Sequence, residues 1–205
     1  ELYSQIAQAF YIPLIIAALV LIIQAVRRRN ISWPPLILIS GTVGALMVAN
    51  EWNSLPFLLN GMPTSSSHAE SLALGILQGL GAGVGVFFYL ILAAAPGETL
   101  YRAWQPQRLR LAAALSMQGI QTREFFRASL AGYGFAAAHL AFLVAFYLAG
   151  KRFGVWSPQD VSYSDLLSTS LPWLYPLTIS LLAACSEEFW FRLLAVPLVR
   201  RLSGS

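Results

Sequence analysis

The chain has 205 residues, of which 57% are apolar and only 11% are charged, against roughly 25% charged in an ordinary soluble domain. This composition excludes a soluble globular protein, because too few charged residues remain to cover its surface. The net charge of +4 comes from basic residues that are spread along the chain, and without a contiguous basic face it predicts no nucleic-acid partner.

Five apolar stretches are long enough, or nearly so, to cross a bilayer, which takes about 20 residues of helix. They lie at about 4–26, 34–50, 71–95, 128–149 and 171–199. The first has no basic leading segment and no small-residue cleavage site, which a signal peptide would need. We therefore predict an all-α fold, a polytopic helical membrane protein with about five transmembrane helices in one domain, 1–205.

The segments between these stretches differ in composition. Turn-forming residues in 51–70 predict a loop without a continuous helix. Residues 97–121 interleave apolar residues with arginines and contain Pro106, which suits a segment lying in the membrane interface; a solvated loop is the alternative. Residues 151–168 form the next loop.

The basic residues orient the spans. Alternating crossings place ten of them on one side: Arg27, Arg28, Arg29, Arg102, Arg108, Arg110, Arg123, Arg127, Arg200 and Arg201. The other side has only Lys151 and Arg152. By the positive-inside rule the ten face the cytoplasm. The expected location is a bacterial plasma membrane, with membrane lipid as the first partner.

Glycines in the third stretch follow a regular spacing. Gly75, Gly79 and Gly83 recur at every fourth position, with Gly81 and Gly85 between and after them. The spacing does not fit a dinucleotide-binding fingerprint. It predicts a smooth stripe for close helix packing in lipid.

Two adjacent carboxylates, Glu187 and Glu188, interrupt the last apolar stretch. A charge at the middle of a membrane helix costs about 2.5–3.5 kcal/mol, so such residues are candidates for function. Arg192 lies four residues after Glu188, the favourable order for an ion pair on a helix. Glu187 has no basic residue at a suitable spacing. We therefore predict that Glu187 handles a proton while Glu188 and Arg192 maintain the geometry; the alternative is a charged helix end in the interface.

The Glu187-Glu188-x-x-x-Arg192 pattern inside an apolar helix resembles the first motif of the CPBP family, which contains CAAX proteases, bacteriocin-processing proteins and Rce1-type prenyl endopeptidases. The resemblance implies an intramembrane glutamate-type endopeptidase acting on membrane-associated peptide or protein substrates, prenylated ones included. In this comparison Glu187 activates the attacking water, and Glu188 and Arg192 support it.

The family's later histidine motifs do not follow Arg192 in this sequence. Phe135-x-x-x-His139 has the spelling of one of them but precedes the glutamates, so the role is not carried over. Since the chain also begins with Glu1, we expect a fragment of a longer protein. It would comprise N-terminal spans (1–150) and the twin-glutamate helix (171–203), inactive alone and partnered by further C-terminal helices.

No metal site is predicted, because the chain has one cysteine, Cys185, and the H-x-E at His68 lacks the paired cysteines of a zinc deaminase. A lone His139 on a membrane helix predicts a hydrogen-bonded packing residue. The sequence identifies no cofactor. Two other functions stay open: a transporter or permease that uses Glu187 as a proton- or ion-coupling carboxylate, and a catalytically silent membrane scaffold.

Overall fold

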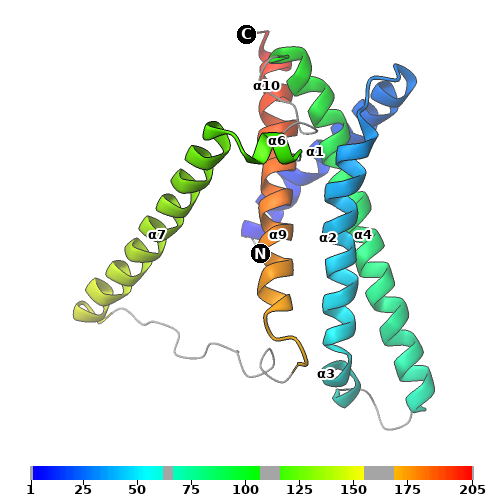
Figure 1. Cartoon of the computed structure of the whole chain (residues 1–205), viewed down its shortest axis with the longest axis vertical. Coiled ribbons are helices and arrows are strands. Elements are labelled where there is room, and N and C mark those ends of the chain that lie inside the picture. The colour runs from blue at the N-terminus through cyan, green and yellow to red at the C-terminus, as the bar shows by residue number, and fades with distance from the viewer. Residues whose placement is uncertain (1, 62–66, 107–115, 155–168, 205) are drawn as a thin grey trace. The chain divides into compact units, whose positions relative to one another are not determined.

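The computed structural model describes residues 2–61, 67–106, 116–154 and 169–204, and within these ranges every regular element is a helix (Figure 1). Three helices are long and apolar enough to cross a membrane: α2 (Trp33–Asn53), α4 (His68–Trp104) and α7 (Arg123–Arg152). The Tyr11–Arg27 part of α1 (Leu2–Arg27) is a shorter apolar helix. The prediction of an all-α membrane protein is confirmed.

The chain divides into two compact units. The smaller, residues 110–163, contains α6 (Met117–Ile120) and α7. Thr122 caps α7 by accepting a hydrogen bond from the Phe125 backbone N–H at 3.2 Å, which satisfies a donor that the first turn leaves free. The larger unit, residues 1–109 and 164–205, holds the remaining helices and the buried core.

The glycine stripe is a packing surface of α4, as the sequence predicts: Gly79 and Gly83 face α2, and Gly75 faces Leu55 and Leu58, which follow α2. A Cβ at Gly44 would lie 2.8 Å from the Gly83 carbonyl oxygen, and one at Gly83 would lie 2.6 Å from that of Gly44. Gly75 and Gly79 are buried as well. By contrast, a Cβ at Gly81 or Gly85 would meet nothing within 4 Å, so the four-residue spacing alone selects the packed face.

Helix α4 corrects the predicted boundary at residue 95. A capping box between Ser67 and Glu70 begins the helix, which then continues through Pro96 to Trp104. Residues 97–104 therefore belong to α4 and not to a separate interfacial segment. Membrane helices tolerate an internal proline when neighbouring elements satisfy the freed backbone, and Pro96 is buried among them. Residues 107–115 of the predicted interfacial segment lie outside the described residues.

The first loop is shorter than predicted, because helix α2 continues to Asn53 and the six-residue helix α3 (Leu55–Asn60) follows it. Pro56 stands in the first turn of α3, where a missing N–H costs no helical hydrogen bond. The loop prediction for 151–168 is largely outside the described residues, although α7 extends to Arg152.

The core of the larger unit surrounds the last third of α4. Leu90 and the run Ala93, Ala94 and Ala95 are fully buried, as is Leu36 on α2. Helices α1 and α2 and the C-terminal segments Glu188–Ala195 and Val196–Ser203 contact α4. This central helix therefore packs directly on the segment that carries Glu188 and Arg192.

Candidate functional site

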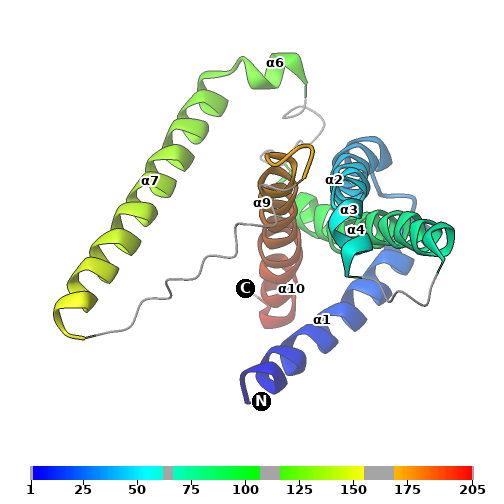
Figure 2. The same cartoon turned by 90° about the horizontal axis from the view of Figure 1, so that it is seen from below.

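The twin-glutamate segment lies in a continuous helical rod. Helix α9 (Leu174–Glu187), the π-helix η1 (Glu188–Ala195) and α10 (Val196–Ser203) follow one another without a gap, and Figure 2 shows α9 in line with α10. A π-helix carries wider, i→i+5 backbone bonds and frequently marks functional sites. Here it begins at the second glutamate of the motif.

The start of the rod is held against α2. The side-chain amide of Asn53 donates to the Leu171 carbonyl and its oxygen accepts from the Leu171 N–H, both at 3.0 Å. Further along, the hydroxyl of the buried Thr178 lies 3.5 Å from the Leu46 carbonyl oxygen of α2, and it also donates to the Leu174 carbonyl within α9 at 2.8 Å. These contacts fix the rod before it reaches the glutamates.

One face of η1 is buried against α4. This face consists of Phe189, Trp190, Leu193 and Leu194. A Cβ at Gly97 would lie 2.9 Å from both the carbonyl carbon and the carbonyl oxygen of Leu193, so only glycine allows this close approach. The Trp190 ring packs 5.3 Å, between centroids, from the ring of Tyr89.

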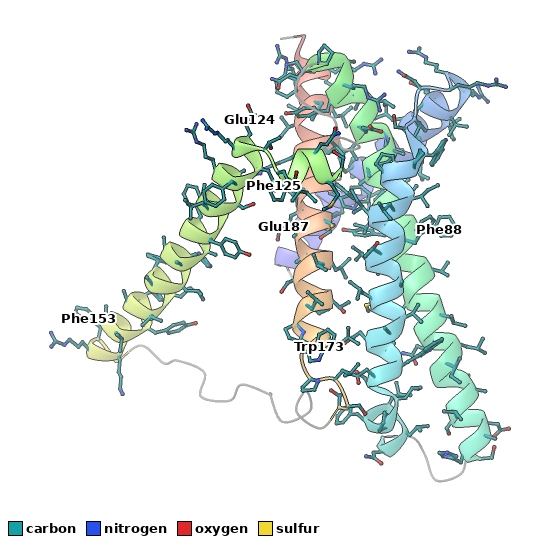
Figure 3. All side chains as sticks on the ribbon, viewed as in Figure 1. Phe88, Glu124, Phe125, Phe153, Trp173 and Glu187 are labelled. Atoms are coloured by element: carbon teal, nitrogen blue, oxygen red, sulfur yellow. The ribbon has the colours of Figure 1, made fainter. Side chains whose placement is uncertain are left out.

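The opposite face carries the motif. Glu187, Glu188 and Arg192 are all exposed in the larger unit, and Figure 3 shows Glu187 on the side of the rod turned away from α2. Phe191 shares this exposed face and meets Tyr11 of α1 edge to face, with ring centroids 6.5 Å apart. The apolar residues of the motif therefore seat the helix, and its charged residues are presented outward.

Glu188 and Arg192 form the ion pair that their spacing predicts. Arg192 Nη1 lies 2.9 Å from Glu188 Oε1. The Arg192 side chain is 78% exposed and the Glu188 side chain is 53% exposed, so the ion pair lies outside the protein core. The pair neutralises one of the two adjacent negative charges.

Glu187 has no hydrogen bond or ion pair with any residue in the part of the chain that the structure describes. Its neighbour Ser186 donates its hydroxyl back to the Ala183 carbonyl at 3.0 Å and so does not bind it. The Glu187 carboxylate is therefore available to an external group, such as a water molecule, a substrate or another protein segment.

A further carboxylate that the structure buries, Glu98, was not predicted from the sequence. Glu98 on α4 is 3% exposed, and its Oε1 pairs with Arg102. Arg102 also donates to Ser32 Oγ at 2.9 Å, while the buried Glu98 Oε2 has no hydrogen-bond partner among the described residues. The signal was present, because Glu98 and Arg102 have the same Glu-x-x-x-Arg spacing as Glu188 and Arg192, but the predicted end of the span at 95 left both outside it.

The two histidines do not join the glutamates within either unit. His68 opens α4 in the larger unit, and His139 lies on α7 in the smaller one; both are exposed. The packing hydrogen bond predicted for His139 is not formed with any described residue. No cluster of three or more His, Cys, Asp or Glu that could hold a metal occurs within the described ranges.

Comparison of the chain with protein-family models, with curated proteins and with solved structures finds no match. The resemblance to the CPBP family therefore depends on the motif itself and on the arrangement of its three charged residues.

Proposed function

We propose that this chain carries the twin-glutamate helix of an intramembrane glutamate-type endopeptidase that resembles the CPBP family. One observation supports the proposal most directly. On the exposed face of an apolar rod, at its π-helical turn, Glu188 is paired with Arg192 at 2.9 Å while the adjacent Glu187 has no partner among the described residues. This arrangement provides one free and one neutralised carboxylate at the same place.

The chemistry follows from that separation of roles. The free Glu187 carboxylate accepts a proton from a water molecule, and the oxygen of that water attacks the carbonyl carbon of a peptide bond. The proton then passes from Glu187 to the leaving amine as the C–N bond breaks, which yields an acid and an amine. Glu188, held by Arg192, positions Glu187 and the water. In the family, histidines supply further groups at this site.

The substrate class proposed for this site is a membrane-associated peptide or protein, with prenylated peptides included. The exposed face that carries Glu187 is bordered by apolar residues such as Phe191 and Leu181, which suit a substrate segment that lies in lipid. The proposed orientation places the arginine-rich ends of the helices in the cytoplasm of a bacterial cell.

Glu187→Gln in the whole product of the gene, in its native membranes, tests the function. Glutamine keeps the shape but cannot take a proton, so hydrolysis should fall by about a hundred- to ten-thousand-fold. The readout is the set of new N-termini in membrane proteins, compared between wild-type and variant cells. Glu124→Gln is the matched control, since Glu124 is an exposed glutamate in the first turn of α7, and it should leave cleavage unchanged.

Persistence of every cleavage product in the Glu187→Gln cells would reject the proposal. A transporter or permease would then be the stronger candidate, and the buried Glu98 with its unpartnered Oε2 favours it, because carboxylates buried in membrane bundles mark ion and proton pathways. Proton-coupled uptake into vesicles, lost in Glu187→Gln, would support that second function.

A further inference from the structure

The larger unit contains a hollow of 120 Å³ where α1, α4 and α10 end. This volume is about ten times the roughly 10–15 Å³ that one water molecule needs on the same measure. The hollow therefore has room for a phosphate group together with part of the molecule that carries this phosphate. Figure 1 shows the ends of α4 and α10 close together, next to the C-terminus.

Four residues that line the hollow are polar or basic. They are Gln24 of α1, Arg28 and Asn30 directly after α1, and Arg201 of α10. Within the described ranges, neither arginine has a carboxylate within 4.0 Å. The nearest acidic residue in sequence to the α4 lining is Glu98, which is already paired with Arg102. Two arginines, one directly after α1 and one on α10, thus line the same cavity, and neither is paired with a carboxylate of the described residues.

Helix C-termini carry partial negative charge, which opposes an anion. Here the last carbonyls of α1 are largely occupied, since Ala25 O accepts from the Asn30 N–H at 3.2 Å and Val26 O accepts from the Arg29 N–H at 3.0 Å. Each helix end contributes only about half an elementary charge, whereas Arg28 and Arg201 each contribute a full one. The balance at the hollow is positive.

The rest of the lining is mostly apolar. It consists of Leu21 and Ala25 of α1 and Leu100 and Ala103 of α4, with Thr99 of α4 as a polar member. The end of α4 is tied to α10, since the Arg200 guanidinium carbon lies 4.6 Å from the centroid of the Trp104 ring. A free anion would use only the basic residues of this lining, whereas an amphiphile would use its apolar residues as well.

We propose that this hollow binds a phosphate group, and that the phosphate belongs to the headgroup of an anionic phospholipid. Arg28 and Arg201 bind the phosphate oxygens by charge-assisted hydrogen bonds. The first carbons of the acyl chains pack on the apolar residues of the lining. Basic pockets between membrane helices are suited to such headgroups, and this site does not depend on the proposed peptidase activity.

The test uses the purified chain in a neutral detergent, with bound lipid counted by native mass spectrometry. Dioleoylphosphatidylglycerol should remain bound at concentrations where dioleoylphosphatidylcholine does not. The double variant Arg28→Gln with Arg201→Gln should weaken phosphatidylglycerol binding by about tenfold or more. Arg28→Lys with Arg201→Lys should recover most of it, because both charges remain.

Arg27→Gln with Arg29→Gln is the matched control, since it removes the same charge from residues that do not line the hollow; it should change binding less than about threefold. Equal losses in the two glutamine pairs, or equal retention of both lipids by the wild-type chain, would overturn the site. Inorganic phosphate or glycerol 3-phosphate displacing the lipid at equal concentration would overturn its assignment to a lipid headgroup. If a variant does not fold, the preference of the wild-type chain for phosphatidylglycerol over phosphatidylcholine still tests the proposed lipid site.

Discussion

Two Glu-x-x-x-Arg pairs occupy opposite environments in the same unit. Glu98 is buried against the core and its partner Arg102 is one-third exposed, whereas Glu188 and Arg192 are both more than half exposed. The residue spacing is identical, so burial alone distinguishes them. A pair that is open to its surroundings contributes about 0–1 kcal/mol, but a buried carboxylate that loses its partner becomes an uncompensated charge.

Removing each arginine should therefore have unequal costs. Arg102→Ala is expected to lower the free energy of unfolding by about 3–5 kcal/mol, because Glu98 is left charged in the core. Arg192→Ala should lower it by less, because Glu188 is not enclosed by protein and can turn toward water or detergent headgroups. Unfolding in mixed micelles with increasing denaturing detergent gives both values. Similar costs for the two variants would contradict the burial difference.

At the scale of the helical elements, the position of the twin-glutamate rod depends on one close approach. The Leu193 carbonyl of η1 rests on Gly97 of α4, and the four buried residues of η1, Leu193 among them, fill the interface. Because this seat is on the side opposite to the motif, it orients Glu187 and Glu188 outward without touching them. Packing and chemistry are thus assigned to different faces of one helix.

A methyl group at the seat should disturb it. Gly97→Ala places a Cβ against the Leu193 backbone, which cannot move aside as a flexible side chain could, and overpacking of this kind costs about 1–3 kcal/mol. Gly81→Ala on the same helix meets nothing within 4 Å and should be neutral or stabilise by up to about 1 kcal/mol. Thermal unfolding in detergent compares them; a stable Gly97→Ala protein would exclude the close contact.

At the scale of the whole molecule, charge asymmetry determines the proposed orientation. Ten arginines fall on one side of the predicted spans, and only Lys151 and Arg152 fall on the other. Both units take part in this pattern, since α7 of the smaller unit has Arg123 at its first residue and Lys151 near its end. The orientation of the helices across the membrane can therefore be tested separately in each unit.

Single cysteines on a Cys185→Ser background provide the test, with a membrane-impermeant thiol reagent applied to intact cells. Asn60→Cys in the larger unit and Lys151→Cys in the smaller unit should be labelled from outside. Arg27→Cys and Arg123→Cys should be labelled only after the cells are opened. All four residues are exposed, so lack of labelling reports the side of the membrane. External labelling at Arg27 or Arg123 would reverse the proposed topology.

The helical fold, the positions of the spans to within a few residues at most ends, the packed glycine stripe and the Glu188–Arg192 pair were all predictable from the sequence. Each of these depends on local spacing: apolar length sets a span, four-residue periodicity sets a helix face, and an i,i+4 step sets an ion pair. Helix α4 continues beyond its predicted end through Pro96, which is buried. The helices that pack around this stretch are not visible in the spacing of residues within α4.

Three features were decided by tertiary structure alone. Glu98 is a buried carboxylate because other helices pack around α4, which no spacing within α4 reveals. The outward presentation of Glu187 follows from the seat of Leu193 on Gly97, two residues that are far apart in the sequence. The basic hollow exists because α1, α4 and α10 end near one another, so that Arg28 and Arg201 both line it. Sequence periodicity determines which face of a helix is apolar, but only the packing of other helices determines which charged groups are then buried, paired or left open.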